Sequence, residues 1–320
     1  MNVTVIVPTY RRPNDLVRCL EALKNQTRLP GEVFIVVRDT DAETWSFLKN
    51  FNPDSLLLST VKVTIPGQVA ALNAGLDRAK GEIVAITDDD AVPHKNWLEK
   101  IESHFLADKT VGGVGGRDFL YINNQFIEGT KKTVGKLQWF GRAIGNHHLG
   151  IGEPREVDIL KGANMSFRKD AIAELRFDER LRGTGAQVHN DLMFCLAVRK
   201  KGWKLIYDPK VEIDHYQGQR FGEDIRRQFN AAASNNRVHN ETLTLLEYLT
   251  PPQRFVFLLW AVLVGTRGAS GFLQCIRFLP SKGILSGQEL MASLRGRWQG
   301  YQTWHQTKNN LPANYGYATE

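Results

Sequence analysis

The sequence is organised around residues 81–93, GEIVAITDDDAVP, a strand-like apolar run that ends on three consecutive carboxylates. Asp is depleted in β-strands, and three adjacent anions repel one another, so the cluster is costly unless positive charge lies against it. If the chain is still extended there, Asp88 and Asp90 point to the same side. Because carboxylate oxygens suit Mg²⁺ or Mn²⁺, we expect a divalent cation at this position. The alternative is a solvated acidic turn in which Asp90 caps a helix that starts near Pro93.

The length of 320 residues allows one large α/β domain, or one domain with a substantial appendage. With 42% hydrophobic and 23% charged residues, the composition is that of a globular protein and argues against disorder. The net charge of +7 suits an anionic ligand, nucleic acid or a lipid surface. We find no nucleic-acid-binding module in the sequence and expect no nucleic-acid partner.

The cysteines and the N-terminal residues indicate the cellular compartment in which we expect the protein. Cys19, Cys195 and Cys275 lie far apart within apolar patterns, which is typical of reduced core residues rather than of a disulfide framework or a zinc site. The chain opens on the β-branched run Val3–Val7 instead of a charged leader with an apolar segment, so we expect no signal peptide. The expected location is the cytoplasm, with peripheral attachment to the cytoplasmic face of a membrane as an open alternative.

Strand-like and helical patterns alternate over the first 110 residues. Such alternation predicts parallel strands with right-handed helical crossovers. Ligands of these sheets bind at the carboxyl ends of the strands, and Thr9, Asp39 and Asp88 each lie just past a predicted strand end. We therefore expect three loops to meet at one edge. The predicted strands cover 2–7, 32–37, 61–65 and 82–87, and the predicted helices start at Asn14 and cover 44–48 and 68–79.

The middle of the chain is less regular. A helix is expected over 97–106 and a strand over 111–116, whose glycines lack the GxGxxG dinucleotide-binding pattern. Residues 117–156 are polar, aromatic and irregular. Asp191 lies at the predicted start of a helix, where the macrodipole favours its ionised form. The plain explanation of Asp191 is helix capping, which stabilises a helix by about 0.5 to 2 kcal/mol.

Taken together, an ordered series of motifs resembles the family 2 glycosyltransferases with the GT-A fold. The resemblance covers about residues 1–216. It implies an α/β nucleotide-diphospho-sugar transferase fold, with a mixed central sheet flanked by helices and a mainly helical C-terminal extension. It also implies transfer of a sugar from a nucleotide diphosphate sugar to an acceptor hydroxyl, with inversion at the anomeric carbon. The motifs are VIVPTY at 5–10, NAG at 73–75, DDD at 88–90, GANMSFR at 162–168, Asp191, GW at 202–203 and YDP at 207–209.

The resemblance also implies a metal site. By similarity, Asp88 would lie near the ribose of the nucleotide and Asp90 would contact the metal, with the division of roles between them left open. His215 resembles a position that adds a metal or phosphate contact in some relatives, although a lone His is more often a structural hydrogen-bonding residue. A bound Mg²⁺ or Mn²⁺ would stabilise, as a Lewis acid, the charge that grows on the diphosphate leaving group.

Inversion by a single displacement needs a base that takes the proton of the attacking hydroxyl, and we assign this role to Asp191. Members of the family commonly have Glu-Asp here, whereas this chain has Asn190-Asp191. The departure replaces an acidic neighbour by a neutral amide.

The nucleotide site is expected in the loops after the first two strands and at the acidic triplet. Asp39 is placed to accept the N3 proton of uracil, and Tyr10 offers an aromatic face. A UDP-sugar is therefore the favoured donor, with GDP- and TDP-sugars left open. The residues expected to bind the nucleotide are Pro8, Thr9, Tyr10, Arg12, Asp39, Asn73, Asp88 and Asp89.

We expect a catalytic domain over 1–216, with a nucleotide-binding half (1–110) and an acceptor-binding half (111–216), followed by a helical, basic and apolar region over 217–320. This region has a helical pattern over 221–238 and an apolar run over 255–265, shorter than the roughly 20 residues that span a bilayer. The run is either a buried helix of a small domain or part of an interfacial helix pair on an anionic membrane. The second alternative is supported by Arg254, Arg267, Arg277, Lys282, Arg295 and Arg297 against one acid, Glu289.

Two functions compete with sugar transfer. A non-catalytic nucleotide-sugar or glycan-binding scaffold of the same fold is favoured by Asn190, but the acidic triplet and Asp191 argue against it. A sugar nucleotidyltransferase would need a Gly-rich first loop ending in a basic residue, which Pro8-Thr9-Tyr10 is not. For a transferase, the acceptor would be a glycan or a lipid-linked glycan, and the sugar and the linkage stay open.

Overall fold

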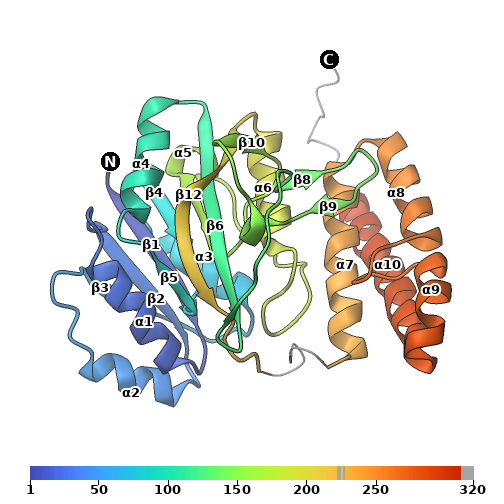
Figure 1. The fold of residues 1–320 in the computed structure, drawn as a ribbon, viewed down its shortest axis with the longest axis horizontal. Coiled ribbons are helices and arrows are strands. Elements are labelled where there is room, and N and C mark those ends of the chain that lie inside the picture. The colour runs from blue at the N-terminus through green and yellow to red at the C-terminus, as the bar shows by residue number, and fades with distance from the viewer. Residues whose placement is uncertain (222–224, 226–227, 311–320) are drawn as a thin grey trace.

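The structure is a computed structural model that describes residues 1–221, 225 and 228–310 (Figure 1). Its strands are β1 (Val3–Thr9), β2 (Glu32–Arg38), β3 (Leu58–Val63), β4 (Ile83–Ile86), β5 (Ala91–Pro93), β6 (Val111–Ile122), β7 (Gln125–Phe126), β8 (Lys136–Leu137), β9 (Ala143–Ile144), β10 (Arg155–Val157), β11 (Met165–Arg168) and β12 (Lys204–Tyr216). Its helices are α1 (Pro13–Lys24), α2 (Ala42–Asn50), α3 (Gln68–Arg78), α4 (Trp97–Ala107), a 3₁₀ turn (His147–Leu149), α5 (Lys169–Ile172), α6 (Asn190–Lys200), α7 (Ala231–Tyr248), α8 (Pro251–Leu263), α9 (Phe272–Lys282) and α10 (Ile284–Asn310).

One mixed sheet forms the centre of the fold. Its strands follow the order β10-β12-β6-β11-β4-β1-β2-β3, with β5 beside β12 and β7 beside β6. Strands β1 to β4 pair in parallel, while β11 runs antiparallel to both β4 and β6. The predicted mixed sheet with flanking helices is therefore confirmed, and the parallel strands carry their loops to one edge.

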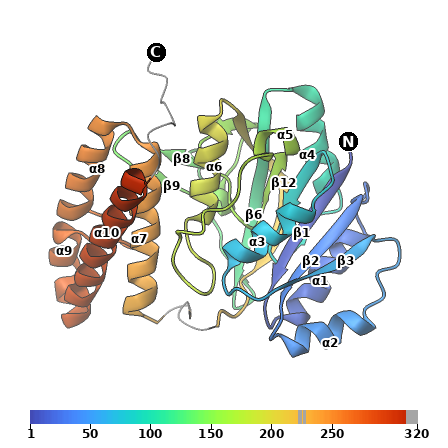
Figure 2. The ribbon, with the colours of Figure 1, turned by 180° about the vertical axis from the view of Figure 1, so that it is seen from behind.

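The sheet is covered on both faces because its central strands are apolar on both sides. In β1, Val3, Val5 and Val7 belong to the core cluster that includes residues of α1 and α4. Ile6 belongs to the opposite cluster, with residues of α3 and α6, which lie in front of the sheet in Figure 2. Helix α3 approaches closely, since a Cβ atom on Gly75 would lie 2.6 Å from Cγ2 of Ile6. Period-two side chains thus explain the three-layered arrangement.

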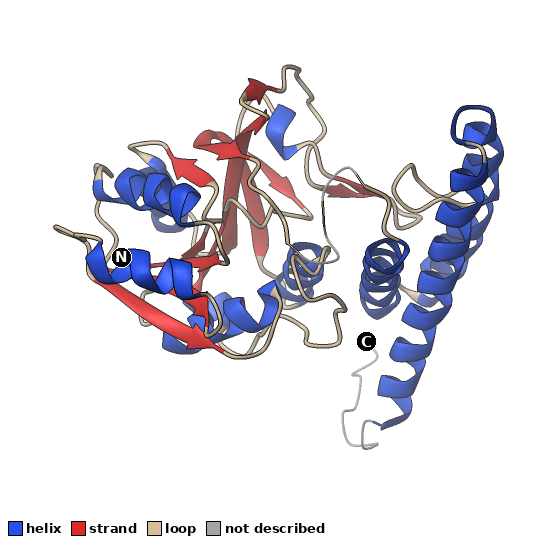
Figure 3. Ribbon diagram, turned by 90° about the horizontal axis from the view of Figure 1, so that it is seen from below, coloured by secondary structure: helices blue, strands red, loops and turns tan. Residues whose placement is uncertain are grey.

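Among residues 231–310 of the described chain, the regular elements are the helices α7 to α10. Figure 3 shows the strands gathered on the side of the N-terminus and long helices on the opposite side. Helices α7 and α10 pack along each other through glycines: a Cβ atom on Gly296 would lie 2.6 Å from the carbonyl oxygen of Asn235, and one on Gly300 would lie 2.7 Å from that of His239. Small residues therefore let the two backbones approach. The predicted helical C-terminal extension is confirmed.

The hairpin β8–β9 extends from the sheet-containing part and packs against the C-terminal helices (Figure 1). Leu137 packs against the cluster of Leu245, Leu249, Phe257 and Ala261 from α7 and α8. The ring of Phe140 lies 5.1 Å from that of Trp260, centroid to centroid. Apolar and aromatic contacts thus hold the helical part against the segment that precedes β10.

One expectation and one alternative were wrong, and a third prediction falls partly outside the described residues. Residues 117–122 continue β6 instead of starting an irregular segment, because they pair with β12 across a register shift. Asp90 does not cap a helix: Ala91–Pro93 pairs with β12, and α4 begins four residues later. Part of the helix predicted over 221–238 lies outside the described residues, and the described helix, α7, begins only at Ala231.

None of the helices in the described part of the chain combines the length and apolarity needed to cross a bilayer. The apolar run over 255–265 forms most of α8, which has 13 residues. This agrees with its expected shortness.

Candidate functional site

A pocket of roughly 460 Å³ opens at the carboxyl edge of the parallel strands. Its wall is shared by segments that are far apart in the sequence. The loops after β1 and β4 contribute one side, and residues near the start of α3 contribute another. The lining residues are Pro8, Thr9, Tyr10, Arg11, Arg12, Val36, Arg38, Val63, Pro66, Gly67, Gln68, Ala71, Asp88, Asp90, Thr184, Gly185, Ala186, Gln219, Arg220 and Phe221.

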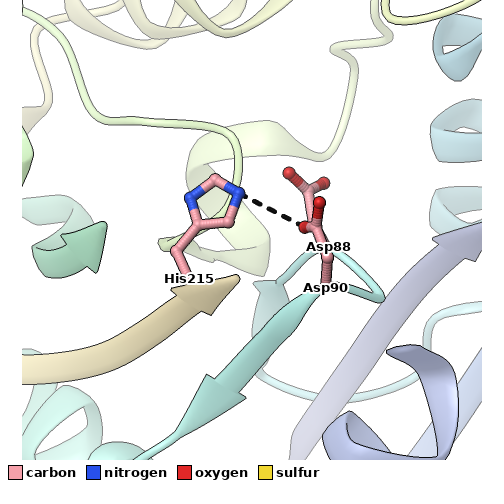
Figure 4. A group of neighbouring side chains, drawn as sticks. All are labelled: Asp88, Asp90 and His215. Atoms are coloured by element: carbon pink, nitrogen blue, oxygen red, sulfur yellow. Dashed lines mark ion pairs between the residues drawn. The ribbon is translucent and has the colours of Figure 1, made fainter. Parts of the chain in front are cut away.

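Two residues of the acidic triplet, Asp88 and Asp90, lie beside His215 (Figure 4), and both carboxylates line the pocket. Strand β5 follows the triplet and pairs with the end of β12, which sets His215 opposite Ala91. Asp88, Asp90 and His215 each offer one ligand atom, and these atoms lie within 4.8 Å of one another. Nε2 of His215 is 3.3 Å from Oδ1 of Asp90.

The atoms of this group fit a divalent cation. Oδ1 of Asp90 and Nε2 of His215 are buried, and apart from their contact with each other neither atom has a hydrogen-bond partner among the described residues. Burial, followed by the charge of Asp90, raises the pKa of Asp88, so the site carries more negative charge than the protein stabilises there. Two carboxylates and one imidazole form a donor set suited to Mn²⁺ or Mg²⁺. Asp88, Asp90 and His215 are thus a candidate metal site.

His215 is held from behind by Asp118, a residue that the sequence analysis missed. Its Nδ1 lies 3.4 Å from Oδ2 of Asp118, which also forms an ion pair with Lys161. Burial alone would lower the pKa of His215, but hydrogen bonds to Asp118 and Asp90 raise it to about 9. Asp118 is fully buried in β6, and a charged residue continuing an apolar strand was the available signal. Carboxylates in this position orient metal-binding imidazoles.

Arg12 supplies the positive charge that the triplet requires. Its guanidinium lies 2.5 Å from Oδ1 of Asp89 and 2.9 Å from Oδ2 of Asp90. Burial alone would lower the pKa of Arg12, but the two carboxylates raise it. In Asp90, burial opposes ionisation, yet the hydrogen bond with His215 and the charges of His215 and Arg12 hold its pKa well below the usual range. The lowered pKa favours the ionised carboxylate of Asp90, which is the form that binds a cation.

The predicted nucleotide-binding residues fall into two groups. Pro8, Thr9, Tyr10, Arg12 and Asp88 line the pocket. Asp39, Asn73 and Asp89 are not among the lining residues.

Asp89 is fully buried and faces Arg12. Asn73 exchanges two hydrogen bonds with the backbone of Phe177, at 2.9 and 2.8 Å. Asp39 lies beside the lining residue Arg38, and its Oδ1 accepts a hydrogen bond from the backbone N–H of Thr40 at 2.9 Å. Asn73 and Asp89 thus support the pocket walls, while Asp39 lies at the rim.

Asp191 is the second residue of α6. Its Oδ1 accepts a hydrogen bond from the N–H of Leu192 at 2.8 Å, and its Oδ2 faces the N–H of Gly162 at 3.3 Å. The N-cap position is taken by His189, which has the left-handed backbone angle φ of 77°. The structure therefore brings together two motifs, residues 162–168 and Asp191, that are separate in the sequence.

Two hydrogen bonds connect Asn190, the residue before the proposed base, with Asp88 of the acidic triplet through Gln68. The side-chain amide of Asn190 donates to Oε1 of Gln68 at 3.2 Å, and the amide of Gln68 donates to Oδ1 of Asp88 at 3.1 Å. A neutral amide at position 190 is suited to this contact, since it donates where a carboxylate would accept. Gln68 is a second site residue that the sequence analysis missed.

Comparison with known proteins gives one family and several relatives. The family description "Glycosyl transferase family 2" matches residues 4–176, just over half of the chain. The chain is 25% identical over 268 residues to glycosyltransferase AglE of Haloferax volcanii, covering 82% of this chain and 80% of that protein. It is 24% identical over 225 residues to the glucosyl-dolichyl phosphate glucuronosyltransferase of the same organism, covering 67% and 69% of the two chains.

Solved structures share the fold. The crystal structure of GalNAc-T7 with UDP, GalNAc and Mn²⁺ matches with a TM-score of 0.63 at 13% identity, covering 98% of this chain and 58% of that one. The mannosyltransferase PcManGT from Pyrobaculum calidifontis, in complex with GDP-Man and Mn²⁺, matches with a TM-score of 0.54 at 20% identity, covering 96% and 88%. Both structural neighbours contain Mn²⁺.

Proposed function

This chain belongs to glycosyl transferase family 2, and on that premise we propose that it transfers a sugar from a UDP-sugar to a hydroxyl of a glycan or lipid-linked glycan. It is a nucleotide-sugar glycosyltransferase (EC 2.4) with the GT-A fold, and membership of the family implies inversion at the anomeric carbon. The observation that carries the proposal is the convergence of Asp88, Asp90 and His215 at the pocket lined by the first loop.

Asp88, Asp90 and His215 would hold Mg²⁺ or Mn²⁺, and when bound the ion would supply Lewis-acid stabilisation of charge on the diphosphate. The chain's own residues support this arrangement. Arg12 keeps Asp90 ionised, and Asp118 orients the imidazole of His215. Arg11 and Arg220 add positive charge to the pocket wall, which suits an anionic ligand.

Asp191 is proposed as the base. In the displacement, the acceptor hydroxyl loses its proton to Asp191, its oxygen bonds to the anomeric carbon, and the bond from that carbon to the diphosphate oxygen breaks. The hydrogen bonds from Leu192 and Gly162 support the proposal, because backbone N–H donors favour the ionised form that accepts a proton. The position of Asp191 at a helix N-terminus acts in the same direction.

The uridine base would lie near Tyr10 and Asp39, and the diphosphate would lie near the metal ligands. Asp39 would accept the N3 proton of uracil and Tyr10 would offer an aromatic face, so UDP is the favoured nucleotide of the donor. We propose the division of labour expected from the sequence: 1–110 for the nucleotide, 111–216 for the acceptor and 217–320 as an appended helical region. Residues 184–186, from the proposed acceptor half, and residues 219–221, from the appended region, also line the pocket, which supports a site shared by these parts.

A lipid-linked acceptor is supported by the similarity to the glucosyl-dolichyl phosphate glucuronosyltransferase. The name of that relative describes an acceptor with a lipid phosphate, and the basic C-terminal helices of this chain would suit such a substrate.

The test is a donor screen. UDP-, GDP- and TDP-sugars are added with and without Mn²⁺, and thermal unfolding and release of the free nucleotide are measured. We expect UDP-sugars with Mn²⁺ to give the largest rise in unfolding temperature, because a ligand that binds only the folded state stabilises it. Stabilisation by GDP-sugars alone would contradict the choice of base. A response that does not depend on Mn²⁺ would contradict the metal site.

A further inference from the structure

Helix α8 presents a row of large apolar side chains to solvent. Phe255, Leu259 and Leu263 are exposed, Phe255 to 70%, and they follow one another at intervals of four residues. This interval places them on one side of the helix. The buried contacts of α8 come from Phe257 and Ala261, which pack against Leu245 and Leu249 of α7. The exposed row is therefore additional to the core of the helical part.

Helix α9 repeats the pattern and buries no residue of its own. Its exposed apolar residues are Phe272, Leu273, Ile276 and Leu279, of which Ile276 is exposed to 66%. Their spacing is again that of one helix face. Figures 1 and 2 show α8 and α9 at the outer edge of the molecule, with α7 between them and the sheet. We call these seven side chains of α8 and α9 the apolar face.

No other segment of the described chain covers the seven side chains of the apolar face. A soluble monomer rarely exposes contiguous large hydrophobic groups without a partner. The question is which partner would cover them.

The charge around the apolar face indicates an anionic partner. Residues 251–310 contain seven Lys and Arg residues, of which Arg297 is buried and paired with Glu241, and a single acid, Glu289, which is paired with Lys282. Three of these cations, Arg267, Arg277 and Lys282, gather around the ring of Phe278, with their charged groups 5.9, 5.5 and 5.2 Å from its centroid. Pairing this surface with a second copy would bring like charges together.

We propose that the apolar face docks onto an anionic phospholipid surface, with α8 and α9 lying in the interface instead of crossing it. Amphipathic helices that combine large apolar side chains with Lys and Arg bind membranes in this manner. Each cation near the surface adds attraction to anionic headgroups. The length of the two helices, 13 and 11 residues, agrees with an interfacial position.

The test is flotation of the full-length protein with vesicles. One set contains phosphatidylcholine alone, and the other contains phosphatidylcholine and phosphatidylglycerol in equal amounts. The variant is Ile276→Glu, and the matched control is Leu106→Glu, since Leu106 is 65% exposed on α4 in the sheet-containing part. Both substitutions put the same charge on an equally exposed helical position. Circular dichroism and the stabilisation by nucleotide and Mn²⁺ verify that each variant is folded.

We expect the wild-type chain and Leu106→Glu to float with anionic vesicles, only weakly with neutral ones, and less as salt is added. Ile276→Glu should bind the anionic vesicles about tenfold or more weakly, because an apolar side chain that would enter the membrane is replaced by a charge. Equal binding of Ile276→Glu and wild type would overturn the proposal, as would equal binding to neutral vesicles.

A third outcome concerns self-association. If wild type elutes as a dimer on size-exclusion chromatography and Ile276→Glu as a monomer, the apolar face is an interface between copies and the proposal is wrong. The vesicle and chromatography readouts do not depend on sugar transfer. Failure of this proposal is therefore distinguishable from failure of the donor assignment.

Discussion

At the scale of single residues, Arg12 explains how the chain tolerates three adjacent carboxylates. It pairs with Asp89 and Asp90, and leaves Asp88 beside the pocket. Each member of the triplet therefore has a different environment, although the sequence presents them as equivalent. Asp89 supports the structure, while Asp90 and Asp88 face the site.

Replacing Asp191 by Asn tests the proposed base. The amide is nearly the same size but does not accept the proton of the acceptor hydroxyl, so transfer should fall by about 10² to 10⁴-fold. Nucleotide binding should change little, since Asp191 is not among the residues that line the nucleotide pocket. Turnover and the shift in unfolding temperature with nucleotide and Mn²⁺ are measured in parallel. Near-normal turnover in Asp191→Asn would show that another group is the base.

Asp118 is expected to act through His215. The Asp118→Asn variant weakens the support of the imidazole, and we expect Mn²⁺ affinity to fall by about 10 to 100-fold. Asp208→Asn is the matched control, because Asp208 also lies 2.8 Å from a histidine, His104, which is not part of the metal-ligand group found among the described residues. Calorimetric titration with Mn²⁺ distinguishes the two. Equal Mn²⁺ affinities of the two variants would remove Asp118 from the site.

At the scale of elements, the close contact between α7 and α10 depends on glycines, which have no side chain to separate the two backbones. Gly300→Ala would place a Cβ atom 2.7 Å from the carbonyl oxygen of His239, and should destabilise the protein by about 1 to 3 kcal/mol. Gly287→Ala on the same helix has no neighbour within 4 Å, and should stabilise by about 0.5 to 1 kcal/mol through helix propensity. Urea denaturation measures both. Similar changes in the two variants would mean that the helices are not closely packed.

The same helix pair should make stability depend on pH. His239 is fully buried between Asn240 and Thr303, and burial lowers its pKa from 6.5 to about 4. Between these values the unfolded chain binds a proton that the folded chain does not. The stability contributed by neutral His239 is therefore present above pH 6.5, and is lost as the pH falls towards 4, by a total of about 3 kcal/mol.

The measurement is the free energy of unfolding at several pH values for wild type and His239→Gln. Gln removes the titrating group while keeping hydrogen-bonding capacity. We expect a shallower decline below pH 6.5 in the variant. An unchanged decline would assign the pH dependence to other groups, such as His147 and His189, whose pKa values are also lowered by desolvation.

At the scale of the whole molecule, the helical region is connected to the site by Asn240 of α7. Its Oδ1 accepts from the N–H of Arg182 at 2.8 Å, and its amide donates to the carbonyl oxygens of Arg182 and Val188 at 3.0 and 3.1 Å. The loop between these residues includes 184–186, which line the pocket, and it leads into Asp191. The appended helices thus help to position the loop before the base.

We expect Asn240→Ala to lower kcat/KM by about tenfold or more, because loss of three hydrogen bonds releases the loop and misplaces groups at the site. It should also destabilise the protein by roughly 1 to 3 kcal/mol. Thr244→Val is the control, as Thr244 is equally buried one turn later, and its hydroxyl has no hydrogen bond to the described residues. Kinetics and thermal unfolding are compared. If Asn240→Ala loses stability but keeps its kinetics, the connection is structural alone.

The sequence by itself determined the order of the strands and helices in the first half, the mixed α/β architecture by family resemblance, and the acidic triplet at a strand end. These features are local, since periodicity and turn residues encode them within about ten positions. It also indicated an apolar and basic C-terminal region, without deciding whether that region is a core or a surface.

Only the tertiary structure decided which side chains meet. Arg12 reaches Asp89 across 77 positions, Asp118 reaches His215 across 97, and Asn190 reaches Gln68 across 122. Such pairs are created by strand register and helix packing, which no local pattern specifies. The exposure of the apolar face was decided in the same way: α8 buries Phe257 and Ala261 and leaves its other apolar side chains in solvent, while α9 buries none of its residues.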